Sequence, residues 1–123
     1  MNIVKKNPQT ITTQPYVIHL QGRLDANQVA REKNRYIDEV TRLKQPLVLS
    51  LSEVSFIDST GLGFLVAMQQ AQASVGKGFA ICALTDKTRL LLELTRLNMV
   101  FDIYETESMA IEALTNSPGN LAN

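Results

Sequence analysis

The hydrophobic positions of the chain form short runs, separated by segments in which apolar residues recur every three or four positions. The first run, Tyr16–Leu20, lies between Pro15 and Gly22 and is rich in residues that favour strands. From Ala26 to about Lys44, apolar residues recur at helical spacing with charged residues between them. The pattern therefore predicts a strand followed by an amphipathic helix.

The same alternation continues along the rest of the chain. The run Leu47–Leu51 is apolar on both faces, which is typical of a central strand in a covered sheet. Strands that alternate with helices predict one α/β domain, built as a four- or five-stranded mixed sheet packed with about four helices. The remaining expected elements are a short edge strand over 9–13, strands over 79–84 and 100–104, and helices over 59–75, 86–97 and 106–114.

Individual residues predict how the helices begin and which faces they bury. Asp25 or Asn27 can cap the first helix, Asp86 can cap the third, and Thr106 can cap the fourth. Leucines 90–92 are expected in the core. On the second helix one apolar face should pack inward, and three glutamines should face away from it: Gln69, Gln70 and Gln72.

Composition narrows the class of protein. The 123 residues include 45% hydrophobic residues, with 12 basic and 12 acidic side chains, so the formal net charge is zero. This balance disfavours binding to nucleic acid or to an anionic membrane, because both require a basic excess. We find no signal peptide, and the longest dense apolar stretch, 62–68, is too short to span a bilayer. We expect a soluble, cytoplasmic domain over 9–115, with short flexible termini at 1–8 and 116–123.

Candidate catalytic residues are few. His19 is the only histidine and lies inside a predicted strand, so a structural role is favoured. Cys82, the only cysteine, lies in an apolar run and is expected to be a small buried side chain, with no disulfide or thiolate metal site. There is no nucleophile elbow, Walker loop or dinucleotide fingerprint. The sequence therefore predicts no enzyme, no cofactor and no metal.

One segment, Asp58 to Gly63, joins the central strand to the second helix. Asp58 or Ser59 can be an ordinary helix cap, and Gly61 and Gly63 can let the helix pack close to the sheet. Each glycine in a helix costs about 1 kcal/mol relative to alanine, so a second interpretation is that the missing side chains allow another molecule to approach the backbone. A phosphate on Ser59 would be well tolerated at a helix N-terminus. Both readings remain open at this stage.

The 58–63 segment resembles the Asp-Ser-(Ser/Thr)-Gly-Leu motif of STAS domains, specifically the bacterial anti-sigma factor antagonists. Leu20-Gln-Gly-Arg-Leu-Asp25 resembles the Leu-x-Gly-x-Leu-Asp turn of the same family, and Gly76-Lys-Gly-Phe79 resembles its glycine turn into the third strand. The resemblance covers about residues 9 to 115, with the motifs in the family's order.

This resemblance implies a regulatory role for the matched residues. Ser59 is the phosphoacceptor of an ATP-using anti-sigma factor serine kinase, and a PP2C-type phosphatase resets it. The unphosphorylated form binds the kinase and frees a sigma factor, whereas the phosphorylated form is released. The implied partner-binding residues are Asp25, Asp58, Ser59, Thr60, Gly61 and Leu62.

An alternative from a different class also fits the resemblance. The chain can be a non-phosphorylated STAS interaction module or a sensor of a nucleotide or other ligand. A monomer or a weak homodimer is expected in either case. Incubation with a cognate kinase and ATP separates the phosphorylation switch from the sensor, which a ligand-induced thermal shift would detect.

Overall fold

A five-stranded sheet with strand order β1-β2-β3-β4-β5 forms the centre of the protein. The computed structural model describes residues 2–4 and 14–115, so the edge strand expected over 9–13 and the expected flexible termini lie largely outside it. β1 (Asn2–Val4) runs antiparallel to β2 (Tyr16–Leu24). β3 (Leu47–Ile57), β4 (Phe79–Cys82) and β5 (Ile103–Tyr104) continue parallel to β2. The predicted mixed sheet and the central place of β3 are confirmed.

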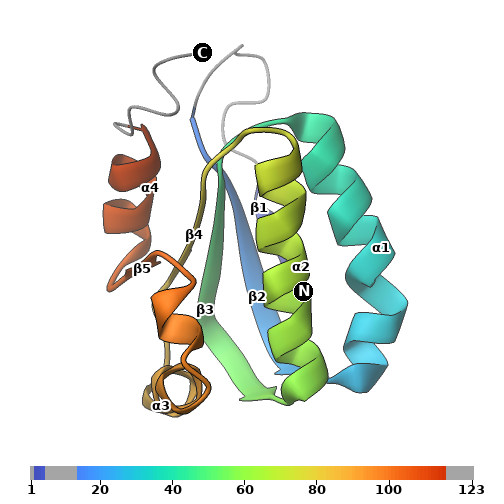
Figure 1. The fold of residues 1–123 in the computed structure, drawn as a ribbon, viewed down its shortest axis with the longest axis vertical. Coiled ribbons are helices and arrows are strands. Elements are labelled where there is room, and N and C mark those ends of the chain that lie inside the picture. Colours follow the sequence, from blue (N-terminus) through green and yellow to red (C-terminus); the bar gives the residue numbers. More distant parts are fainter. Residues whose placement is uncertain (1, 5–13, 116–123) are drawn as a thin grey trace.

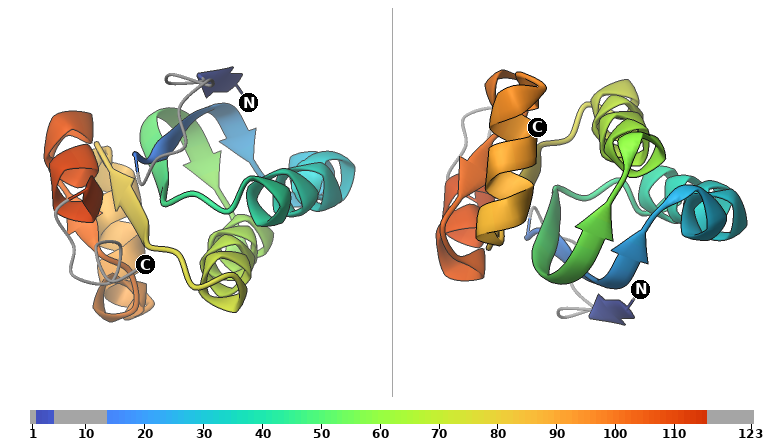
Figure 2. Two further views of the ribbon diagram at one scale, coloured as in Figure 1. Left: turned by 90° about the horizontal axis from the view of Figure 1, so that it is seen from above. Right: turned by 90° about the horizontal axis from the view of Figure 1, so that it is seen from below.

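Four helices pack on this sheet, as predicted. They are α1 (Ala26–Leu43), α2 (Ser59–Ser74), α3 (Asp86–Leu94) and α4 (Glu107–Thr115). α1 and α2 lie side by side over one region of the sheet, and α4 lies well apart from them (Figures 1 and 2). Within the described part of the chain, no helix has both the length and the apolar character needed to cross a bilayer.

The two faces of the sheet bury different side chains because neighbouring residues of a strand point in opposite directions. Ile18, Leu49 and Ile81 pair across β2, β3 and β4 and belong to the larger core under α1, α2 and α3. The residues just before them, Val17, Val48 and Ala80, pair in the same way. They form a smaller core on the opposite face with Ala110 and Leu114 of α4.

One glutamine of α2 differs from the prediction. Gln72 was expected to face away from the core, but its side chain is fully buried. Its Nε2 donates hydrogen bonds to the backbone oxygens of Gln45 (2.8 Å) and Gly78 (2.9 Å), which satisfy the amide nitrogen in the interior. Gln72 therefore ties the end of α2 to the loops that enter β3 and β4.

The region after β4 also differs from the prediction. Thr85, rather than Asp86, caps α3, because its Oγ1 accepts from the Thr88 N–H at 3.2 Å. The helix ends at Leu94, and a 3-10 turn, η1 (Leu97–Met99), precedes a strand of only two residues. Of the three leucines expected in the core, Leu92 is buried, Leu91 is half-buried, and the Leu90 side chain is 55% exposed.

Candidate functional site

The implied binding residues lie at one end of the molecule, where β2 and β3 finish and α1 and α2 begin (Figure 1). Parallel strands followed by helices bring these two junctions together, because the ends of neighbouring strands share one edge of the sheet. The backbone N–H of Asp58 points to the carbonyl oxygen of Leu24 at 3.4 Å, which links the junctions directly. Residues far apart in the sequence therefore form a single surface.

Asp25 begins α1. Its Oδ1 accepts from the Gln28 N–H at 3.1 Å, and its Oδ2 accepts from the Arg23 Nε at 3.0 Å. The hydrogen bond from Gln28, followed by that from Arg23, holds the pKa of Asp25 below its usual value. Asp25 is therefore the helix cap that the sequence allowed, rather than Asn27, and its carboxylate is ionised at neutral pH.

Asp58 serves two helices with one carboxylate. Its Oδ1 accepts from the Gly61 N–H at 2.9 Å and caps α2, and its Oδ2 accepts from the Ala26 N–H at 3.1 Å at the start of α1. Unpaired N–H groups at helix starts carry partial positive charge, so a carboxylate placed between two of them stabilises both. Asp58 therefore fixes the position of α1 relative to the 58–63 segment.

The two glycines of the segment have different surroundings. A Cβ added at Gly61 would lie 2.1 Å from the carbonyl oxygen of Leu24, a distance that no real contact allows. A Cβ added at Gly63 would meet nothing within 4 Å. Position 61 therefore requires glycine because the helix packs closely against the end of β2, which is the first of the two interpretations of the sequence.

The structure divides the implied partner-binding residues into two groups. Ser59 and Thr60 are exposed on the first turn of α2, and no hydrogen bond holds the Ser59 hydroxyl within the described residues. Gly61 and Leu62 are buried, which differs from the expectation that both belong to a docking surface. An approaching protein would thus meet Ser59 and Thr60 first, beside the carboxylates of Asp25 and Asp58.

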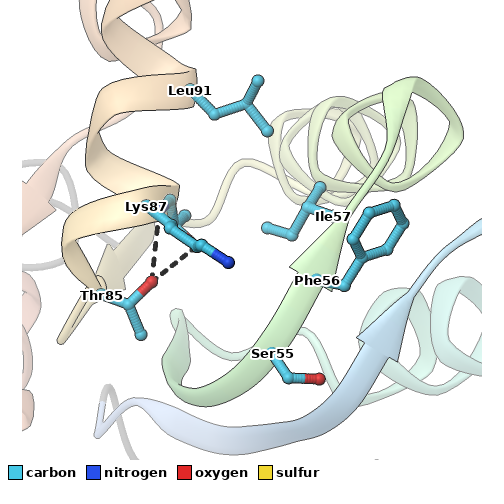
Figure 3. A pocket seen from close by; sticks show the side chains of 7 residues that line it. Ser55, Phe56, Ile57, Thr85, Lys87 and Leu91 are labelled. Atoms are coloured by element: carbon cyan, nitrogen blue, oxygen red, sulfur yellow. Dashed lines mark hydrogen bonds between the residues drawn. The ribbon is translucent and has the colours of Figure 1, made fainter.

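Two hollows that the sequence did not indicate flank Phe56, whose side chain is 41% exposed. The guanidinium of Arg23 lies 4.2 Å from the centre of the Phe56 ring, a cation–π contact. An open hollow beside it is lined by Arg23, Asp25, Ala26, Asn27, Phe56 and Asp58. A more enclosed hollow of about 240 Å³ lies between the end of β3 and α3 (Figure 3). Asp25 and Asp58 belong to the matched motifs, but the hollows themselves form only where these side chains meet others in the folded sheet.

The remaining candidate residues lie under α4, away from this surface. The Nε2 of His19 lies 2.9 Å from Oε1 of Glu107, a contact between β2 and α4. Cys82 is fully buried, and burial raises the pKa of its thiol to about 11. No group of three metal-ligating side chains occurs among the residues that the structure describes.

Comparison with curated proteins gives relatives over most of the chain. An anti-sigma-B factor antagonist from Listeria monocytogenes is 32% identical over 92 residues, which cover 73% of this chain and 79% of the relative. A relative from Thermotoga neapolitana is 36% identical over 66 residues, or 54% of this chain, and the match spans 58% of that relative's length.

Solved structures agree with the fold. An anti-sigma factor antagonist from Mycobacterium paratuberculosis superposes with a TM-score of 0.74 at 28% identity, over 91% of this chain and 90% of the other. SpoIIAA from Bacillus, solved in a phosphorylated form, has a TM-score of 0.61 at 20% identity, covers 89% of this chain and 96% of its own, and shares the fold. The STAS domain family model matches residues 3–110. This chain therefore belongs to the STAS domain family.

Proposed function

We propose that the chain is an anti-sigma factor antagonist, which binds an anti-sigma factor serine kinase while Ser59 is unphosphorylated and is released when Ser59 carries a phosphate. A PP2C-type phosphatase would restore the binding form. The observation that carries this proposal is the exposed Ser59 hydroxyl on the first turn of α2, beside the buried Gly61 and the two-helix cap Asp58. The names of the relatives support an anti-sigma factor as the partner, and the family resemblance adds the kinase and the phosphatase.

The placement of Ser59 suits reversible phosphorylation. An exposed hydroxyl can enter a kinase active site without local unfolding, and the helix start can accommodate the phosphate's charge. The phosphate adds close to two negative charges to a surface that already holds Asp25 and Asp58. A partner that packs against this surface would have to desolvate that charge, so its affinity should fall while the fold is retained.

A phosphorylation assay tests the proposal. Incubation with a purified anti-sigma factor serine kinase and ATP should add one phosphate, and mass spectrometry of the proteolytic peptide should locate it on Ser59. The Ser59→Ala variant should take up none and should still bind the kinase. Modification of Thr60 or Ser55 instead, or binding that does not change with phosphorylation, would contradict the proposal.

A further inference from the structure

The hollow between β3 and α3 adjoins the 58–63 segment. It is lined by Ser55, Phe56 and Ile57 of β3, by Thr85 and by the first turns of α3, and its volume is about 240 Å³. Pockets for small molecules are usually larger, at roughly 300–1,000 Å³. The hollow is therefore small for a nucleotide or a similar ligand, but it has room for one large side chain of a protein partner.

The lining of this hollow is apolar on one side and carries a single charge on the other. Ile57 and Leu91 supply apolar surface, and the hydroxyls of Thr85 and Thr88 are hydrogen-bonded to each other at 3.1 Å. Lys87 is the only charged residue in the lining, and no carboxylate of the described residues pairs with it. Figure 3 shows its side chain extending from α3 across the hollow toward the end of β3. Its ammonium group therefore complements an acidic group.

Exposed apolar side chains occur on both elements that line the hollow. Phe56 of β3 lines it and lies under Arg23, and Leu90 and Leu94 of α3 are 55% and 73% exposed. Aromatic residues, including Phe, and Arg are enriched at protein–protein interfaces. A partner that presents an apolar side chain next to a carboxylate would match the apolar lining of the hollow and the charge of Lys87.

The hollow adjoins the start of α2, where Ser59 lies. Ile57 lines the hollow and precedes Ser59 by two residues, so their Cα atoms are at most about 7 Å apart. A partner segment that fills the hollow would therefore also lie near the start of α2, which carries Ser59.

We propose that the anti-sigma partner inserts one apolar side chain into this hollow and pairs an adjacent carboxylate with Lys87. This inference rests on the proposed function and adds the chemistry of the partner to it. It places the docking surface on both sides of Phe56, across the start of α3 as well as the 58–63 segment.

The test uses a purified anti-sigma factor kinase and titration calorimetry with the unphosphorylated full chain. Lys87→Met should weaken binding about tenfold, and Lys87→Glu about a hundredfold, because the reversed charge repels the carboxylate. Phe56→Ala should weaken it about thirtyfold or more. The matched control is Arg89→Met, on the same helix: Arg89 lies 4.0 Å from Glu105 and does not line the hollow. The affinity of the Arg89→Met variant for the kinase should stay within about twofold of wild type.

Further measurements separate the possible outcomes. Denaturation midpoints of all variants should match wild type, and the affinity of Lys87→Met should depend less steeply on salt. If wild type binds and Ser59→Asp does not, but Lys87→Met behaves like Arg89→Met, the inference fails while the proposed function stands. If no anti-sigma factor kinase binds wild type, both fail. Sedimentation of a homodimer that Lys87→Glu dissociates would assign the hollow to self-association and overturn the inference.

Discussion

The Oδ2 of Asp58 accepts a hydrogen bond from the backbone N–H of Ala26 at 3.1 Å, across 32 positions of sequence. The same carboxylate caps α2 through the N–H of Gly61. Two helices that follow neighbouring parallel strands therefore begin on one side chain. This arrangement couples the place where α1 starts to the place where Ser59 is presented.

Removal of this carboxylate should destabilise the fold. Asp58→Ala leaves two helix-start N–H groups without their partner, and one lost cap costs about 1 kcal/mol, so the free energy of unfolding should fall by about 2 kcal/mol. Urea denaturation at pH 7 measures this change. Asp86→Ala is the control, because Asp86 is exposed and Thr85 already caps α3, and it should change stability by less than about 0.5 kcal/mol. Equal stability of Asp58→Ala and wild type would contradict the two-helix role.

The two glycines of the 58–63 segment should respond in opposite directions to the same substitution. Gly61→Ala forces a methyl group against the Leu24 carbonyl oxygen and should cost at least about 2 kcal/mol. Gly63→Ala meets open space in a helix and should stabilise the chain by up to about 1 kcal/mol. Thermal denaturation of the two variants provides the comparison. A Gly61→Ala variant as stable as Gly63→Ala would show that the close approach to Leu24 is not maintained in solution.

A negative charge at position 59 should separate binding from folding. Ser59→Asp places one charge at the start of α2, where it should be neutral or stabilise the free chain by some tenths of a kcal/mol. In a complex the same carboxylate must be desolvated without a prepared partner, at a cost of about 2–5 kcal/mol. Calorimetry should therefore record an affinity at least about thirtyfold weaker, with an unchanged denaturation midpoint. Tight binding by Ser59→Asp would exclude a mechanism based on charge.

Alkaline pH should destabilise the chain partly through Cys82. Burial raises the pKa of this thiol from 9.0 to about 11, so the folded state holds the proton more tightly than the unfolded state. The stabilising contribution is complete below pH 9 and is lost as the pH rises through about 11. Cys82→Ala removes this contribution, and its unfolding free energy should fall less than that of wild type over this range. Parallel pH dependences in urea denaturation would show that the thiol titrates alike in both states.

The order and type of the main elements could be predicted from the sequence because their hydrophobic patterns extend over many residues. β3 is apolar on both faces and α1 carries a continuous apolar stripe, so neither depends on a single contact. The candidate binding residues, Asp25 and the 58–63 segment, were identified through the family resemblance, and they lie at the junctions between those strands and helices. Helix caps were less certain, because Thr85 and Asp86 are both good caps and only the backbone geometry selects between them.

Features that depend on tertiary contacts could not be predicted. Gln72 is buried because the carbonyl groups of two other loops accept hydrogen bonds from its amide nitrogen. The hollow between β3 and α3 forms because α3 packs against the end of β3. Lys87, which lines this hollow, belongs to no recognisable sequence motif. The sequence left the role of Gly61 open, since nothing in it reveals the distance to Leu24.

The close approach of Gly61 to the Leu24 carbonyl affects how a kinase could recognise Ser59. The shape of the first turn of α2 depends on a strand that ended 37 positions earlier, so a short peptide that spans Ser59 lacks the support that shapes it. A kinase matched to this surface would recognise a conformational epitope rather than a linear consensus. It should modify the intact chain at least about a hundredfold more efficiently than a synthetic 52–66 peptide, a ratio that steady-state kinetics can measure.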